Sequence, residues 1–280
     1  MNNPIYPCLW FDGKAQEAAK FYCAVFGDSN ITTDTPMVVN FELSGQKFMG
    51  LNGGPMFKVN PSISFFVIYE TEAEIETTWQ QLLEGGSVLM PLDKYDWSNK
   101  YGWLQDRYGV SWQLSLGKLK EVGQKFTPTL MFVGKQAGKA EQAVHFYTSI
   151  FDNSDINHII KYAPGEPDKE ENVKHAAFSL NKHGFMAMDS SYPHNFAFNE
   201  AISFVVDCKT QEEIDYYWNK LIDDEGKESR CGWLIDKYGV SWQIIPAILG
   251  QLMSKPGKAD KVMKSVLQMK KLDIEKLQTA

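Results

Sequence analysis

Two short sets of polar residues at equivalent places in the chain could orient a small molecule. The segment GWLQDRYGVSWQL at 102–114 recurs as GWLIDKYGVSWQI at 232–244, with ten of thirteen residues identical. Side chains alternate between the two faces of a strand, so Ser111 and Gln113 share one face, as do Ser241 and Gln243. Hydroxyl and amide groups in apolar surroundings are typical of a site that orients a neutral or aromatic ligand.

The same alternation extends the predicted pocket to other strands. Two central strands, ISFFV at 63–67 and ISFVV at 202–206, present serines that would share a face with these residues. By the same parity, the first strand of each copy would contribute Leu9 and Phe11, or Leu130 and Phe132. The candidate ligand-binding residues are Ser64, Phe66, Trp97, Tyr101, Ser111, Gln113, His194, Ser203, Ser241 and Gln243.

Three of these candidates rest on separate observations. Trp97 and Tyr101 have no counterpart in the second copy, so they either contact a ligand or pack at a sheet edge. His194 lies in a loop before a central strand, and loops at strand ends often border pockets. The other histidines form no HxH or HxxxH pair, which favours surface or capping roles over a metal site.

The sequence contains no recognisable catalytic arrangement. It has no Ser-His-acid pattern, no context that would activate a cysteine and no phosphate-binding loop. Asp106 and Asp236 recur at the first position of a predicted type I turn, where aspartate is favoured for backbone hydrogen bonding. Asp189 is a weaker candidate acid or base, because Asn52 stands near the equivalent position. No catalytic residue is assigned.

The elements that would position these residues also occur in duplicate. FYCAVFGDSNI at 21–31 matches FYTSIFDNSDI at 146–156. Within copy one, a strand at 5–11 precedes a helix, and strands at 38–43 and 47–51 follow. A strand at 63–69, a helix at 72–84 and further strands repeat this order, so the chain holds four similar modules. A Lys-rich tail after Pro246 shows helical patterns near 248–253 and 258–269.

Composition limits the class of protein. The chain has 280 residues, a formal charge of −7 and a pI near 5.3, so we expect no nucleic-acid partner. No apolar run is long enough to cross a membrane. Four cysteines occur singly, as is typical of thiols in a reducing compartment. We therefore expect a cytoplasmic protein.

The module order, with FYxxxF on the first helix and D-[RK]-YGVSWQ at the end, resembles the vicinal oxygen chelate superfamily. That superfamily includes glyoxalase I, bleomycin-resistance proteins and extradiol dioxygenases. Within it, the chain is similar to the PhnB-like group, often labelled 3-demethylubiquinone-9 3-methyltransferase. The resemblance implies an α+β fold of two tandem domains, each a pair of βαβββ modules forming an open cup. The predicted domains are 1–118 and 126–246, followed by a helical tail at 247–280, with the copies pairing within the chain or in a homodimer.

The metal site of that superfamily can be compared position by position. The final glutamate is replaced by Gln113 and Gln243, and the middle-strand position offers Glu42 in copy one but Ser179 in copy two. Proline and alanine cannot ligate a metal, and neutral amides are poor ligands without anionic or imidazole companions. The first-strand and second-module positions hold Pro7, Pro128, Ser62 and Ala201. We therefore predict no metal and no other cofactor.

Two functional hypotheses follow from the sequence. The first is a protein that binds a small molecule without the metal of its superfamily. The alternative is an enzyme, either a divergent lyase, isomerase or dioxygenase or the methyltransferase of the label. The glycine cluster nearest to the required pattern, at 50–54, is followed by Pro55 and leads to no helix, unlike the strand-to-helix turn of common S-adenosylmethionine enzymes.

Overall fold

The computed structural model describes residues 4–255 and 257–280, and its elements repeat in four modules. The first module consists of β1 (Ile5–Phe11), α1 (Ala15–Phe26), β2 (Ser29–Asp34), β3 (Val38–Leu43) and β4 (Gln46–Asn52). The second consists of β5 (Ile63–Tyr69), α2 (Glu72–Leu83), β6 (Ser87–Tyr95), β7 (Ser98–Gln105) and β8 (Ser111–Leu116). The short helix α3 (Leu119–Val122) links the copies.

Copy two and the tail follow the same plan with different lengths. The third module consists of β9 (Phe126–Val133), η1 (Gly134–Gln136), α4 (Ala140–Ile150), β10 (Asp155–Lys161), β11 (Val173–Leu180) and β12 (His183–Ser190). The fourth consists of β13 (Ile202–Cys208), α5 (Gln211–Leu221), β14 (Lys227–Glu228), β15 (Trp233–Ile235) and β16 (Ser241–Pro246). The tail forms α6 (Leu249–Met253), α7 (Ala259–Gln268) and α8 (Ile274–Thr279).

Local sequence explains where the second helix of each copy begins. The Thr71 hydroxyl accepts a hydrogen bond from the backbone N–H of Glu74, and Thr210 caps α5 through Glu213 in the same way. A threonine followed three residues later by a glutamate is the capping-box pattern, which satisfies N–H groups that a helix leaves unpaired. One face of α2 is apolar and buried, with Ile75, Trp79 and Leu82 in the core.

The strands form two eight-stranded sheets, and each sheet takes one module from each copy. Sheet A has the order β14-β15-β16-β13-β1-β4-β3-β2, and sheet B has the order β10-β11-β12-β9-β5-β8-β7-β6. The copies join where β1 pairs antiparallel with β13, and β5 pairs antiparallel with β9. The predicted α+β fold with paired modules is confirmed, and the two copies are interleaved rather than side by side.

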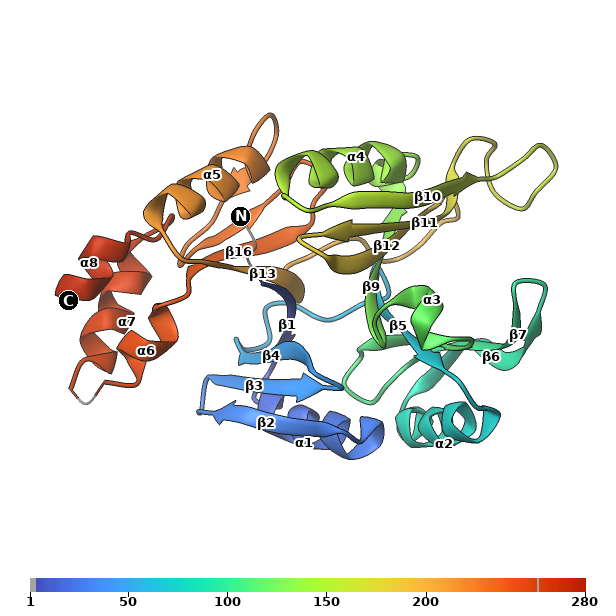
Figure 1. Ribbon diagram of the computed structural model, residues 1–280, viewed down its shortest axis with the longest axis horizontal. Coiled ribbons are helices and arrows are strands. Elements are labelled where there is room, and N and C mark those ends of the chain that lie inside the picture. Colours follow the sequence, from blue (N-terminus) through green and yellow to red (C-terminus); the bar gives the residue numbers. More distant parts are fainter. Residues whose placement is uncertain (1–3, 256) are drawn as a thin grey trace.

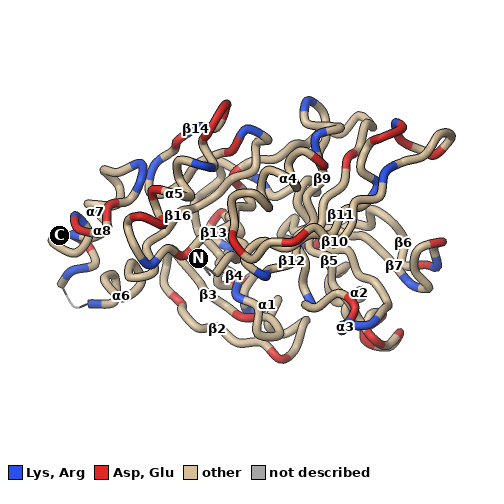
Figure 2. Tube along the Cα trace, turned by 45° about the horizontal axis from the view of Figure 1, so that its top comes forward, with Lys and Arg blue, Asp and Glu red and all other residues tan. Residues whose placement is uncertain are grey.

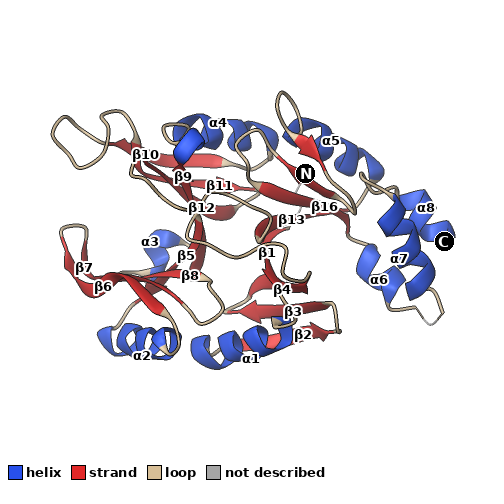
Figure 3. Ribbon diagram, turned by 180° about the vertical axis from the view of Figure 1, so that it is seen from behind, coloured by secondary structure: helices blue, strands red, loops and turns tan. Residues whose placement is uncertain are grey.

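The helices cover one face of each sheet and share a single apolar core. Helices α1 and α2 lie along one side of the molecule, and α4 and α5 lie along the opposite side (Figures 1 and 3). Trp112 of sheet B contacts Tyr22 and Phe26 of α1, with ring centroids 5.3 and 4.8 Å apart. We call this helix-covered side the outer face, and the opposite side of each sheet the inner face.

Several elements have no clear signal in the sequence. The edge strand β2 carries the polar sequence SNITTD, which has no apolar alternation to identify it. The helix α8 is too short to show a periodic pattern. In the tail, Val262 and Val266 are buried as their spacing predicts, in a cluster with Leu252, Leu272 and Leu277.

Charged residues of both signs are spread along the chain, and its helices are short. Lysine and arginine are interspersed with aspartate and glutamate over the whole trace (Figure 2). Within the described residues, no helix is both long and apolar enough to span a membrane. All four cysteines are free thiols, and Cys8 and Cys208 are buried.

Candidate functional site

The repeated Ser–Gln pairs lie on the inner faces, one set in each sheet. In sheet B, Gln113 donates from Nε2 to the Ser64 hydroxyl over 2.7 Å. In sheet A, Gln243 donates from Nε2 to the Ser203 hydroxyl over 2.9 Å. All four side chains are buried. The structure thus brings together the predicted residues of the central and last strands.

The inner face of sheet B carries further hydrogen bonds between its polar side chains. The Tyr101 hydroxyl donates to Gln113 Oε1 over 2.8 Å, and the Trp103 indole donates to Ser111 Oγ over 2.6 Å. Burial raises the pKa of Tyr101 far above its ordinary value of 10.0, so the phenol stays protonated and remains a donor. These polar groups therefore pair with one another rather than with a ligand.

The inner face of sheet A lacks two of these contacts. Cys231 stands where copy one has Tyr101, and the Trp233 ring packs edge-on against Trp10, with centroids 5.9 Å apart. Consequently the Ser241 hydroxyl, in a residue only 1% exposed, has no hydrogen-bond partner in the described part of the chain. The equivalent serines of the two copies thus have different surroundings.

Cys8 completes the polar centre of sheet A. It pairs with Ser203 across the β1–β13 junction, and both residues are fully buried. Burial raises the pKa of the Cys8 thiol to about 12, while hydrogen bonding to Gln243 and Ser203 opposes this shift. At neutral pH the thiol is therefore protonated, and it acts as a small apolar group rather than a nucleophile.

The prediction for the first strands was wrong by one residue. Cys8 is the cross-strand partner of Ser203, so Tyr6, Cys8 and Trp10 share the inner face. Leu9 and Phe11 point to the outer face and belong to the apolar core. Because successive side chains alternate, a shift of one residue moves every side chain to the other face. In copy two, Thr129 pairs with Ser64, so Thr129 and Met131 take the inner positions assigned to Leu130 and Phe132.

The remaining predicted residues lie around sheet B. Phe66 pairs with Gln113 and Thr127 and is half-buried on the inner face. Trp97 is 63% exposed at the β6–β7 turn, where it stacks on Tyr95 and touches Tyr101 edge-on. His194 contacts Ser190 near the end of β12, with Nε2 2.8 Å from Oγ. Within the described chain, no hydrogen bond joins His194 to the other predicted residues.

Two histidines that are far apart in the sequence are in contact on adjacent strands. His158 of β10 and His175 of β11 are stacked, with Nε2 of the first 2.8 Å from Nδ1 of the second. Burial, together with the charge of His158, lowers the pKa of His175 to about 4. They are seventeen residues apart, and only the antiparallel pairing of β10 and β11 could have revealed the contact.

The residues at the centre of each inner face do not fit the divalent metal of the superfamily. In sheet A these positions hold Cys8, Met49, Ser203 and Gln243, and in sheet B they hold Thr129, Met186, Ser64 and Gln113. Each set lacks a carboxylate or imidazole, and each glutamine amide is already bonded to a serine. Glu42 pairs with Lys47 near the sheet edge instead. Among the described residues, no three His, Cys, Asp or Glu side chains could together hold a metal ion.

Asp189, the candidate acid or base, is hydrogen-bonded to the backbone, and so is Asn52 at the equivalent place. Asp189 accepts hydrogen bonds from the N–H groups of Gly138, Ala140 and Val173. Asn52 accepts one from Ala15 at the equivalent place in copy one. These contacts hold the start of the first helix of each copy, and they account for both residues without a reaction.

Comparison with known proteins identifies the fold and the family. The structure resembles glyoxalase I from Zea mays, with a TM-score of 0.57 and 12% identity over 91% of this chain and 98% of that chain. A Bacillus cereus PhnB protein, named after 3-demethylubiquinone-9 3-methyltransferase, is 40% identical over 39% of this chain and 96% of its own, with a TM-score of 0.37. No curated protein matches the sequence.

The paired-module arrangement places the chain in the class of proteins that share the glyoxalase I fold. Within this class, the model for the 3-demethylubiquinone-9 3-methyltransferase family matches residues 3–115 and again residues 124–245. The chain belongs to this family, and each copy represents the family once.

Proposed function

We propose that this protein binds a small, neutral and mainly apolar molecule at the inner face of sheet A, without a metal ion. The Ser241 hydroxyl carries this proposal, because it is buried without a hydrogen-bond partner in the described chain. A buried polar group that lacks its partner costs about 1–3 kcal/mol. A ligand that hydrogen-bonds to Ser241 would recover part of this free energy.

The surroundings of Ser241 favour an uncharged, mostly apolar ligand. Val205 and Ile245 lie on the same face, and Trp10 and Trp233 are half-buried. The Cys8 thiol is protonated at neutral pH, so the centre holds no charge to bind an ion. Aromatic side chains around a few hydroxyl and amide groups are typical of sites that hold a flat or aliphatic molecule and orient one polar group.

The equivalent position in sheet B differs, because its polar side chains already have hydrogen-bond partners within the protein. Ser111 already accepts a hydrogen bond from Trp103, and Gln113 is bonded on both sides by Ser64 and Tyr101. A ligand there would have to replace bonds that the protein makes with itself. We therefore assign binding to sheet A and a supporting role to the network of sheet B.

A ligand screen with paired serine variants tests the proposal. We expect neutral apolar metabolites or antibiotics to raise the melting temperature of the wild-type chain, with no change on adding EDTA. Loss of one hydrogen bond in Ser241→Ala should weaken the best ligand about 5- to 10-fold in calorimetry. Ser111→Ala should retain wild-type affinity. A screen without hits, or hits weakened by Ser111→Ala alone, would overturn the assignment.

A further inference from the structure

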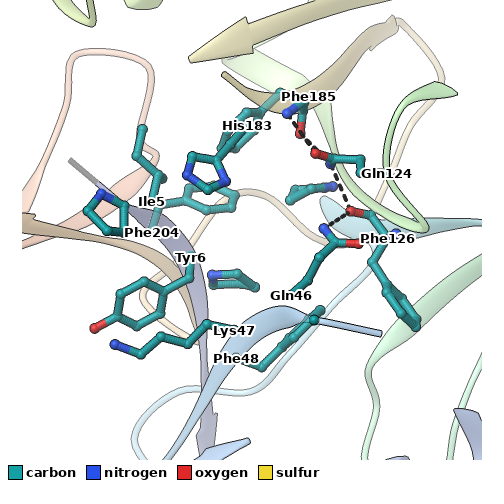
Figure 4. Close-up of a pocket in the computed structure, with 15 residues that line it drawn as sticks. Ile5, Tyr6, Gln46, Lys47, Phe48, Gln124, Phe126, His183, Phe185 and Phe204 are labelled. Atoms are coloured by element: carbon teal, nitrogen blue, oxygen red, sulfur yellow. Dashed lines mark hydrogen bonds between the residues drawn. The ribbon is translucent and has the colours of Figure 1, made fainter. Parts of the chain in front are cut away.

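A separate cavity lies between the two copies, and residues of both copies line it. It has a volume of about 180 Å³ and lies where the first residues of β1, β4, β9 and β12 meet (Figure 4). Pro7 of copy one and Pro128 of copy two occupy equivalent places in its wall, as do Phe48 and Phe185. The apolar wall includes Ile5, Pro7, Phe48, Phe126, Pro128, Phe185 and Phe204.

Two glutamines hold the rim of this cavity in place. Gln46 of copy one donates to the Phe126 carbonyl and accepts from the Phe126 N–H, both over 2.8 Å. Gln124 bonds in the same two-way manner to the backbone of Gly184, over 2.9 Å at each contact. Both amides are satisfied by the backbone, so the rim is preformed and these side chains need no ligand.

Among the described residues of the rim, one polar side chain has no hydrogen-bond partner, and the lysine is paired with a carboxylate. Lys47 lies over the Tyr6 ring, and its ammonium is 3.4 Å from a carboxylate oxygen of Asp207. His183 lies across the cavity from Lys47 (Figure 4) and has no hydrogen-bond partner among the described residues. Burial lowers the pKa of His183 below its ordinary 6.5, so the neutral ring offers one donor and one acceptor at pH 7.

We propose that this cavity is a second binding site, for a neutral molecule with one aromatic ring and one hydroxyl group, of the phenol class. The size fits, since apolar cavities of about 150 Å³ hold benzene. Phenylalanine side chains on several sides favour edge-to-face contacts with a ring. The hydroxyl group would hydrogen-bond to His183, while the ring displaces solvent from the apolar wall.

Titration of the full chain with phenol and with toluene, followed by ligand-observed NMR, tests this site. Phenol should bind saturably to the wild type, and His183→Leu should weaken phenol about 5- to 10-fold while leaving toluene unchanged. Ile5→Phe should abolish binding of both probes by filling the cavity. Phenylalanine already occupies the equivalent position at Phe126, so this variant should fold, which circular dichroism would verify.

The Ser241→Ala variant separates this site from the one on sheet A. It should leave binding of phenol and toluene unchanged, whether or not sheet A binds a ligand. Phenol binding that survives Ile5→Phe but is lost in Ser241→Ala would overturn the cavity assignment. Absence of saturable phenol binding to the wild type at millimolar concentrations, or equal phenol affinity in His183→Leu, would also overturn it.

Discussion

Two buried aspartates organise the repeated hairpin of each copy. Asp106 accepts hydrogen bonds from the backbone N–H groups of Tyr108 and Val110 and from the indole of Trp112. Asp236 makes the equivalent three contacts and also accepts from the Tyr147 hydroxyl. The repeated D-[RK]-YGVSWQ segment is therefore explained by a turn and a buried tryptophan, and only its Ser–Gln pair faces inward.

The raised pKa of Asp106 should be visible in the pH dependence of the free energy of unfolding. Burial raises the pKa of its carboxyl to about 6 from an ordinary 3.8, although the hydrogen bonds oppose this shift. Between pH 6 and 4 the folded chain then holds a proton that the unfolded chain has released. The stability contributed by this group is therefore fully present below about pH 4 and is lost as pH rises through 6.

Urea unfolding of the wild type and of Asp106→Asn checks this expectation. The difference in free energy of unfolding, wild type minus variant, should grow by roughly 2–3 kcal/mol from pH 7 to pH 4. The variant should also be less stable at pH 7, because its amide N–H₂ would face the Trp112 indole donor. A difference that is constant or shrinks toward low pH would contradict the assignment.

At the scale of elements, the copies differ most where the tail packs. Copy one has a long hairpin, with nine residues in β6 and eight in β7, whereas β14 and β15 have two and three. The backbone N–H groups of Cys231 and Gly232 instead donate to the carbonyls of Met269 and Lys270 in the tail. Cys231 and Ile245 pack against the tail cluster, so the tail supports the end of sheet A.

Two leucines of the tail provide a matched test of this support. Leu272 is 0% exposed and Leu267 is 57% exposed. Leu272→Ala should lower the free energy of unfolding by about 2–5 kcal/mol because it leaves a cavity. Leu267→Ala should change it by less than about 0.5 kcal/mol. Equal effects in urea denaturation would mean that the tail does not stabilise the sheet.

At the scale of the whole molecule, each sheet depends on both copies. Separation of the copies would expose β1 and β13 in sheet A, and β5 and β9 in sheet B, as unpaired edges. The two-way hydrogen bonds of Gln46 to Phe126 would be lost as well. The two halves therefore form one folding unit, although each matches the family model by itself.

Expression of 1–122 and 124–280 as separate chains tests this interdependence. Neither half alone should unfold cooperatively, and an equimolar mixture should recover native circular dichroism and elute as a 1:1 complex. A half that instead forms a homodimer would reproduce the same strand pairing between identical modules. Two stable monomeric halves would contradict the interleaved arrangement.

Local patterns alone predicted a large part of this protein. The duplication, the strands at 38–43 and 63–69 and the helix at 72–84 follow from periodicity and turn chemistry within a few residues. The neutral glutamines at the superfamily's metal position were also visible without a structure. The sequence did not reveal which side chains of the first strands face inward. Strand 5–11 is apolar on both faces, so either orientation satisfies its pattern.

Tertiary structure decided which modules share a sheet, and with that the character of each site. The modules resemble one another so closely that local preferences are equally satisfied by pairing within a copy or between copies. The β1–β13 and β5–β9 pairings place Cys8 beside Ser203 and Thr129 beside Ser64. The unpaired Ser241 hydroxyl and the cavity between the copies also depend on contacts between residues far apart in the chain. Such contacts are set by the packing of whole modules, and the spacing of residues along one strand carries no information about that packing.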